Sequence, residues 1–206
     1  MSATPLIHVV DDDQAQRTAL LRLLSAAGFE ARGYASTGDF LLQPPPDRPG
    51  CLLLDVRMPG PSGLDLQAAL LRRGVALPVI FLTGHADVPS SVLAMKAGAV
   101  DFLTKPARRD TLFDAIRRAL ELDALQCAAR EDADRLRARV ASLTPSERRV
   151  FELIVAGMLN KQIADEIGIA ERTVKLQRSH VMSKLGAGSA AELGRLAEQL
   201  RQLSGQ

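Results

Sequence analysis

Five short apolar runs in the first half of the chain have the length and composition of buried strands. They are Leu6–Val10, Cys51–Leu54 and Val79–Leu82, with weaker ones at Ala31–Ala35 and Ala99–Leu103. Between them the apolar residues recur at helical spacing, as in the stripe that ends at Gly28. This alternation of strands and helices predicts an α/β fold, with a five-stranded parallel sheet covered by helices on both faces.

Polar side chains follow four of these strands, at the point where each strand ends. Asp11–Asp13 follow the first strand, Asp55 the third, Thr83 the fourth and Lys105 the fifth. The carboxyl ends of parallel strands meet at one edge of a sheet, and ligands bind at that edge. We therefore expect acids, a hydroxyl and an ammonium group to gather there.

A cluster of acids needs a cation, because two carboxylates about 4 Å apart repel by about 4 kcal/mol at an effective dielectric near 20. Mg²⁺ suits such a cluster, since it takes carboxylate, water and phosphate oxygens as ligands. Lys105 and the Thr83 hydroxyl could then hold the oxygens of a phosphoryl group, whose transfer needs positioning and charge neutralisation. The pattern predicts that Asp55 is a nucleophile that becomes an aspartyl phosphate, and that Asp13 caps the first helix.

Each of these signals has a purely structural explanation when it is taken alone. Asp11–Asp13 could be a turn or a helix cap, Thr83-Gly84 is often a turn, and Lys105-Pro106 by itself indicates little. Complementary groups at four strand ends favour a phosphoryl site over four unrelated turns.

Composition adds the domain count and the compartment. The chain has 206 residues, enough for one large or two small domains, and 47% of them are hydrophobic, so cores can form. The net charge is only +2, but residues 171–184 hold four Lys and Arg against one Glu, a local net charge of +3. Cys51 and Cys127 predict neither a disulfide framework nor a zinc site. The chain shows no signal peptide and no apolar run near the roughly 18 residues of a membrane span, which predicts a cytoplasmic protein.

The second half of the chain has a different, all-helical pattern. The segment 107–140 contains no Gly or Pro and predicts a long helix, whose stretch 121–140 would bridge two domains. A partly disordered linker stays open as the alternative there. Next, Thr144, Pro145 and Glu147 form the pattern of a capping box with proline at the first helical position.

Two short helices around a glycine turn then predict a helix-turn-helix. Asn160 is expected to cap the first of them, Gly168 makes the turn, and 171–185 form the second. On that second helix, Val174, Val181 and Leu185 would face the core, while Lys175, Arg178, Ser179 and Met182 would face outward. A final helix is expected at 190–203. A basic outer face suits a helix that reads DNA, although a solvated helix with a Lys/Arg bias would look similar.

The stretches HVVDDD, LLLDVRMPGPSGLDL and PVIFLTGHADVPSSVLAMKAGAVDFLTKP, together with the carboxyl-terminal module, resemble the two-component response regulators of the FixJ and StyR type. The resemblance covers nearly the whole chain. It implies a flavodoxin-like receiver with strand order 2-1-3-4-5 in 1–120, a helical linker in 121–140, and a four-helix LuxR-type DNA-binding domain in 141–206.

For the receiver, the resemblance implies that Asp55 accepts a phosphoryl group from a sensor histidine kinase, with Thr83 and Lys105 binding its oxygens. Thr83 and Phe102 would form the switch, and the Lys105-Pro106 bond would be cis.

The resemblance also implies a divalent cation, Mg²⁺, at the acidic pocket. Asp12 and Asp55 would be its ligands together with the backbone carbonyl of Arg57, and Asp11 would act through water.

The stretch LNKQIADEIGIAERTVKLQR resembles the LuxR-type recognition element, with two departures. Gln177 replaces the usual histidine, and Ala170 replaces the usual Ser cap, which could cost about 1 kcal/mol of helix stability. The resemblance places eight residues at positions that meet DNA. They are Asn160, Lys161, Thr173, Lys175, Leu176, Arg178, Ser179 and Met182.

We therefore expect a bacterial transcription regulator, and not an enzyme, whose phosphorylation favours a homodimer that binds promoter DNA and recruits RNA polymerase. Two alternatives stay open. An aspartate-nucleophile phosphatase also uses acids and Mg²⁺, but its usual acid two residues after the nucleophile is replaced by Arg57. The other alternative is a phosphate-independent DNA-binding regulator whose receiver acts only as an assembly domain.

Overall fold

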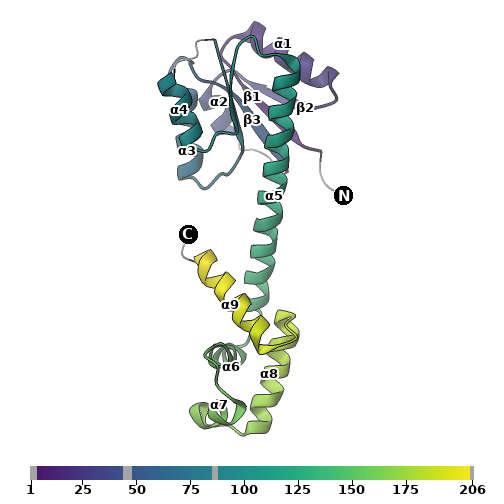
Figure 1. Ribbon diagram of the computed structural model, residues 1–206, viewed down its shortest axis with the longest axis vertical. Coiled ribbons are helices and arrows are strands. Elements are labelled where there is room, and N and C mark those ends of the chain that lie inside the picture. Colours follow the sequence, from purple (N-terminus) through teal and green to yellow (C-terminus); the bar gives the residue numbers. More distant parts are fainter. Residues whose placement is uncertain (1–3, 44–47, 85–87, 205–206) are drawn as a thin grey trace. The chain divides into compact units, whose positions relative to one another are not determined.

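The computed structural model describes residues 4–43, 48–84 and 88–204 (Figure 1). The chain divides into two compact units, Met1–Cys127 and Ala128–Gln206, and helix α5 runs from the first unit into the second. The elements of the first unit are β1 (Leu6–Val10), α1 (Gln14–Ala26), β2 (Glu30–Tyr34), α2 (Thr37–Leu42), β3 (Gly50–Asp55), α3 (Gly63–Arg72), β4 (Val79–Thr83), α4 (Val88–Lys96), β5 (Asp101–Thr104) and the start of α5 (Arg109–Ala141).

The first unit is an α/β fold around one parallel sheet with strand order β2-β1-β3-β4-β5, which confirms the predicted class and order. Alternate residues of a strand point to opposite faces, and β3 shows the consequence. Cys51 and Leu53 pack into the core under α1 and α5. Leu52 and Leu54 pack into the core on the other face, under α2, α3 and α4. Both faces are therefore buried, as the continuous apolar strands indicate.

Strand β5 begins two residues later than the sequence predicts, at Asp101 instead of Ala99. The reason is the way in which α4 ends. Gly98 has φ +85°, and the Ala99 N–H donates to the Ala94 carbonyl at 3.0 Å, so these residues close the helix before the strand can start.

Helix α3 begins in close contact with the end of β3. Ser62 and Asp65 form a capping box at its amino end. A Cβ at Gly63 would lie 2.2 Å from the carbonyl oxygen of Asp55, so only glycine allows this approach. The backbone of Asp55 thus lies directly against the first residue of α3.

Helix α5 is continuous over Arg109–Ala141, which agrees with the predicted helix and not with a partly disordered linker. Within the first unit, the buried carboxylate of Asp123 accepts a hydrogen bond of 2.8 Å from the backbone N–H of Gly50. This bond ties α5 to the amino end of β3. No helix in the described parts of the chain combines the length and hydropathy that a membrane crossing needs.

The second unit holds the end of α5 and four further helices, α6 (Pro145–Val155), α7 (Asn160–Ile167), α8 (Glu171–Leu185) and α9 (Ala190–Ser204). Thr144 and Glu147 form the predicted capping box, with Pro145 at the first helical position. Gly168, with φ +69°, makes the turn between α7 and α8. The predicted inward residues of α8 are buried in the core of this unit; they are Val174, Val181 and Leu185.

Candidate functional site

The predicted polar residues meet at the carboxyl edge of the sheet. Asp11 follows β1, Asp55 ends β3, Thr83 ends β4 and Lys105 follows β5. The first three side chains are buried, at 3%, 9% and 1% exposure. Strand register brings them together, because β1 and β4 both pair with β3.

Lys105 joins two of the acids. Its Nζ lies 2.7 Å from Asp11 Oδ2 and 2.5 Å from Asp55 Oδ2. Burial alone would lower the pKa of Lys105, but the hydrogen bonds to the two carboxylates outweigh it and raise the pKa above its ordinary value. Lys105 is therefore a permanent cation at this edge.

Three carboxylates form the acidic pocket. One oxygen each from Asp11, Asp12 and Asp55 lies within 4.8 Å of the others. Backbone groups orient two of them, because the Asp13 N–H donates to Asp11 Oδ1 at 2.9 Å and the Arg57 N–H donates to Asp55 Oδ1 at 3.1 Å. Three hard oxygen donors, two of them held in place, fit a divalent cation such as Mg²⁺.

Asp13 lies outside that cluster and caps α1, as predicted. Its Oδ1 accepts hydrogen bonds from the backbone N–H groups of Ala15 and Gln16 at 2.8 and 3.0 Å. The bonds from Gln16 are the main cause that lowers the pKa of Asp13. Arg17, which no sequence pattern singles out, donates from its guanidinium to the Asp11 carbonyl at 2.6 Å and so packs beside the pocket.

The two residues of the predicted switch lie on neighbouring strands. Thr83 ends β4, and Phe102 lies in β5, paired with Phe81. The rings of Phe81 and Phe102 are tilted with centroids 6.0 Å apart, and Phe102 is partly buried against the core under α3 and α4. Thr83 thus lies two residues along β4 from Phe81, whose ring packs near that of Phe102.

In the second unit, α8 presents a polar outer face opposite its buried residues. Lys175 and Ser179 are exposed, and Leu176 is 57% exposed although it is apolar. Lys161 on α7 and Thr173 on α8 are exposed as well. Met182 is only partly exposed, because it also packs against the core.

Asn160 does not cap α7, which corrects the prediction. The cap position is Leu159, which makes no side-chain hydrogen bond there, and Asn160 is the first helical residue. Instead, Asn160 Oδ1 accepts a hydrogen bond of 3.1 Å from the guanidinium of Arg178. This bond ties α7 to α8. Gln177, the departure from the usual histidine, donates to Ser146 Oγ at 2.8 Å and ties α8 to α6.

Glu147 fixes the other end of α8. Lys184 Nζ lies 2.6 Å from Glu147 Oε2 and also donates to the Ser142 carbonyl at 3.2 Å. The hydrogen bond from Lys184, followed by that from Thr144, lowers the pKa of Glu147 to about 2. Helix α8 is thus held by polar contacts along its length, so its outer face is presented in a defined orientation.

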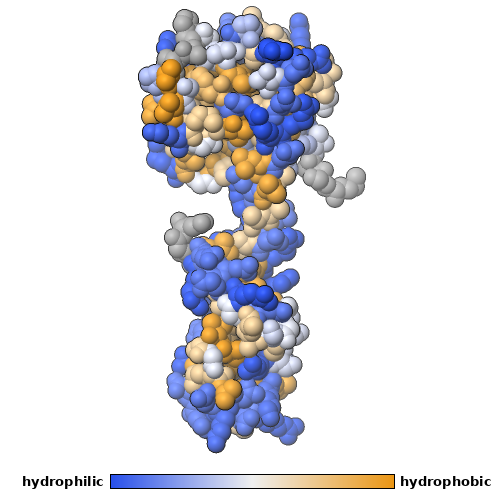
Figure 2. Space-filling model, in the orientation of Figure 1, coloured by the Kyte–Doolittle hydropathy of each residue, from blue (hydrophilic) through white to orange (hydrophobic). Residues whose placement is uncertain are grey.

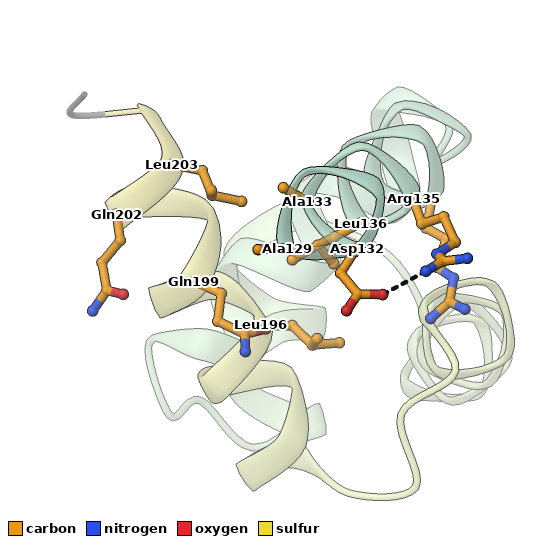
Figure 3. A pocket seen from close by; sticks show the side chains of 10 residues that line it. Ala129, Asp132, Ala133, Arg135, Leu136, Leu196, Gln199, Gln202 and Leu203 are labelled. Atoms are coloured by element: carbon orange, nitrogen blue, oxygen red, sulfur yellow. Dashed lines mark hydrogen bonds and ion pairs between the residues drawn. The ribbon is translucent and has the colours of Figure 1, made fainter. Parts of the chain in front are cut away.

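A pocket of about 540 Å³ lies in the second unit between the last turns of α5 and helix α9 (Figure 3). Leu136, Leu196 and Leu203 line it, and Asp132 pairs with Arg135 at its rim, at 2.7 Å. Its lining, as far as the described residues form it, consists of Ala, Leu, Gln, Asp and Arg side chains.

Comparison with known protein families identifies both units. Residues 7–117 match the response regulator receiver domain, and residues 141–197 match the luxR family of bacterial regulatory proteins. The chain belongs to the response regulators. Receiver domains of this family generally bind Mg²⁺ at an acidic pocket, and the combination of domains implies a histidine kinase and DNA as partners. The family is one of transcription regulators, which is not a class of enzymes.

Relatives match this response regulator over almost its full length. Nodulation protein W of Bradyrhizobium diazoefficiens is 44% identical over 199 residues, which cover 97% of this chain and 88% of the relative. Transcriptional regulatory protein FixJ of Azorhizobium caulinodans is 43% identical over 191 residues, 93% of this chain and 90% of FixJ. The solved structure of response regulator StyR is 46% identical with a TM-score of 0.85, covering 96% of this chain and all of StyR.

Proposed function

We propose that this response regulator accepts a phosphoryl group on Asp55 from a sensor histidine kinase, and that phosphorylation shifts the protein towards a DNA-binding homodimer. The single observation that carries the proposal is the contact of Lys105 with both Asp11 and Asp55 in a buried pocket. In the transfer, a carboxylate oxygen of Asp55 forms the bond to phosphorus while the bond from phosphorus to the kinase histidine breaks.

Each residue of the pocket has a role in that transfer. Asp12 and Asp55 would hold Mg²⁺ with the backbone carbonyl of Arg57, and Asp11 would act through water. The ion would supply charge neutralisation for the phosphoryl oxygens. Lys105 supplies a second, fixed positive charge, and the Thr83 hydroxyl can donate to a phosphoryl oxygen.

The switch follows from the same geometry. Thr83 would move towards the phosphoryl group and Phe102 would follow, since its ring packs beside β4. Helix α4 is the surface that would respond, because it buries only Ala94. Its exposed apolar side chains gather on the surface of the receiver (Figure 2), and they are Val88, Val92, Leu93 and Met95. That face is where we expect the homodimer to form.

The helix-turn-helix would bind promoter DNA through the outer faces of α7 and α8. Lys175, Leu176 and Ser179 are exposed there, and exposed donors and apolar groups are what reads base edges. Arg178 is held by Asn160, which pre-orients its guanidinium for a phosphate or a base. Lys161, Thr173 and Met182 complete the proposed contact set.

The proposed organisation has three parts: a receiver in 1–120, a helical linker in 121–140 and a DNA-binding domain in 141–206. The dimer would bind a two-fold promoter site and recruit RNA polymerase in the cytoplasm.

The decisive experiment measures phosphorylation and dimerisation on one sample. The full-length protein is incubated with acetyl phosphate and Mg²⁺, and its intact mass, its light scattering and its binding to promoter DNA are recorded. We expect one added phosphoryl group, a shift from monomer towards dimer, and tighter DNA binding, all absent in Asp55→Asn. Asp13→Asn is the matched control, because it changes a neighbouring acid outside the pocket.

The outcome separates two functions. An Asp55→Asn protein that dimerises and binds promoter DNA as well as the phosphorylated wild type would contradict the proposal. It would favour a phosphate-independent regulator whose receiver acts only in assembly.

A further inference from the structure

Helix α4 is anchored to the receiver mainly at its carboxyl end. Ala94 is its single buried residue, and most of its other large apolar side chains are exposed. Ala99, just after the helix, is 7% exposed and packs with Ala94 in the core under α3. The anchoring therefore rests on two alanines, which bury little apolar area.

A buried amide supplies a further anchor. Gln67 of α3 is 3% exposed, and its Nε2 donates to the carbonyl oxygens of Ala97 at 3.2 Å and Ala94 at 3.4 Å. The Ala94 carbonyl already accepts from Ala99 N–H, so Gln67 chiefly serves the Ala97 carbonyl. One side chain thus joins α3 to the last turn of α4.

The amide of Gln67 contributes little net free energy to the stability of the fold. Its Oε1 is buried and has no hydrogen-bond partner among the described residues. A buried unpaired acceptor costs about 1–3 kcal/mol, which offsets what the two rather long donor contacts contribute. A buried polar group with so small a net benefit calls for another explanation.

Gln67 also lies one helical turn from the phosphoacceptor strand. Gly63 packs directly against the carbonyl oxygen of Asp55, and Gln67 follows it by four residues on the same face of α3. Helix α3 therefore contacts the backbone of Asp55 through Gly63 and, one turn later, the carboxyl end of α4 through Gln67.

We propose that Gln67 is a positioning residue. It fixes the carboxyl end of α4, so that the helix rotates about that end when Asp55 is phosphorylated. This inference rests on the proposed function. Without the amide contact, Ala94 and Ala99 are left to hold the last turn of α4, and the exposed apolar face of the helix is presented in a less defined orientation.

The test uses Gln67→Met in the full-length protein. Methionine has a similar length, no donor, and no buried oxygen to leave unpaired, so we expect its thermal unfolding to stay close to that of the wild type. Uptake of a phosphoryl group from acetyl phosphate should be unchanged. Hydrogen exchange at 94–99 should be about two- to tenfold faster, and the tightening of the dimer by phosphorylation should fall by about the same factor.

Two control variants separate positioning from stability. Ser91→Ala removes a 2.9 Å side-chain bond to the Val88 carbonyl within α4, without touching α3. Leu70→Val weakens the packing of α3 without altering the amide. Neither should reduce the ratio of phosphorylated to unphosphorylated dimer affinity.

Each result has a definite meaning. A Gln67→Met protein with wild-type exchange at 94–99 and wild-type tightening of the dimer would overturn the role of Gln67. A Leu70→Val protein with the same faster exchange at 94–99 and the same weaker tightening of the dimer would also overturn the role of Gln67. A wild-type protein that takes up no phosphoryl group would overturn the proposed function, and the inference with it.

Discussion

His8 gives the receiver a dependence on pH that can be isolated. It lies in β1, 1% exposed, with Nδ1 2.9 Å from the hydroxyl of Tyr34. The rings of Tyr34 and Phe40 pack on it, with centroids 5.7 and 5.4 Å away. Burial, followed by the charges of Arg48 and Arg32, lowers the pKa of His8 from 6.5 to about 4.

The lowered pKa of His8 makes the folded receiver less stable, relative to the unfolded chain, at acid pH. Below pH 6.5 the unfolded chain takes up a proton on His8, whereas the folded receiver does so only as the pH nears 4. The unfolded state therefore binds more protons in that window, so the stabilisation is fully present above pH 6.5 and is lost as the pH falls towards 4. Between pH 7 and pH 5 the linkage amounts to about 2 kcal/mol.

The single tyrosine provides the assay. The chain has one Tyr and no Trp, and Tyr34 lies in the receiver, so tyrosine fluorescence in a urea titration reports the unfolding of that unit. His8→Asn keeps a polar atom near the position of Nδ1 but does not titrate. We expect it to be less stable at pH 7, and to lose about 2 kcal/mol less than the wild type between pH 7 and pH 5.

His180→Gln is the matched control, because His180 belongs to the second unit and its side chain is 54% exposed. It should keep the pH dependence of the wild-type receiver. If His8→Asn and the wild type lose the same free energy between the two pH values, the reasoning from burial is wrong.

Two further predictions concern Glu147 and the glycines. Lys184 is the chief cause that lowers the pKa of Glu147 from 4.5 to about 2. The contribution of Glu147 to the stability of the folded second unit is therefore present above pH 4.5 and is lost as the pH falls towards 2. Glu147→Gln should flatten that part of an acid titration followed by far-ultraviolet circular dichroism. Gly63→Ala should lower the free energy of unfolding by about 1–3 kcal/mol, because the new Cβ would meet the Asp55 carbonyl. Gly194→Ala should raise the free energy of unfolding by about 0.5–1 kcal/mol, because Gly194 lies in α9 with open space around it. Thermal unfolding measures both changes.

The sequence was enough to predict the acidic pocket at the edge of the sheet, because that pocket depends on topology. Apolar runs located the strands, and a parallel sheet brings the residues after them to one edge. Asp11, Asp55 and Lys105 therefore meet even though up to 94 residues separate them. The capping box at Thr144 could also be predicted from the sequence, because its contacts span only three residues.

The polar contacts between helices could not be predicted in the same way. Gln67 looks like one more polar residue in a helix, and nothing in its spacing indicates carbonyl partners 27 and 30 residues away. Asn160 follows the rule for a helix cap, yet its side chain bonds Arg178 because packing of α7 on α8 brings the two together. Tertiary geometry decides between two local uses of the same side chain.

The contacts in the pocket suggest how phosphorylation of Asp55, as proposed, would act as a switch. Lys105 already bonds both Asp11 and Asp55, so its positive charge is shared between two buried carboxylates. A phosphoryl group on Asp55 would carry nearly two negative charges in place of the single charge of the carboxylate, and it would use one carboxylate oxygen for its own bond. Lys105 would then exchange a contact, and the Thr83 hydroxyl would donate to a phosphoryl oxygen within the same buried space. Because Thr83 lies beside the strand of Phe102, and α4 follows β4 in the chain, we expect this local exchange of partners to act on α4, which buries only Ala94.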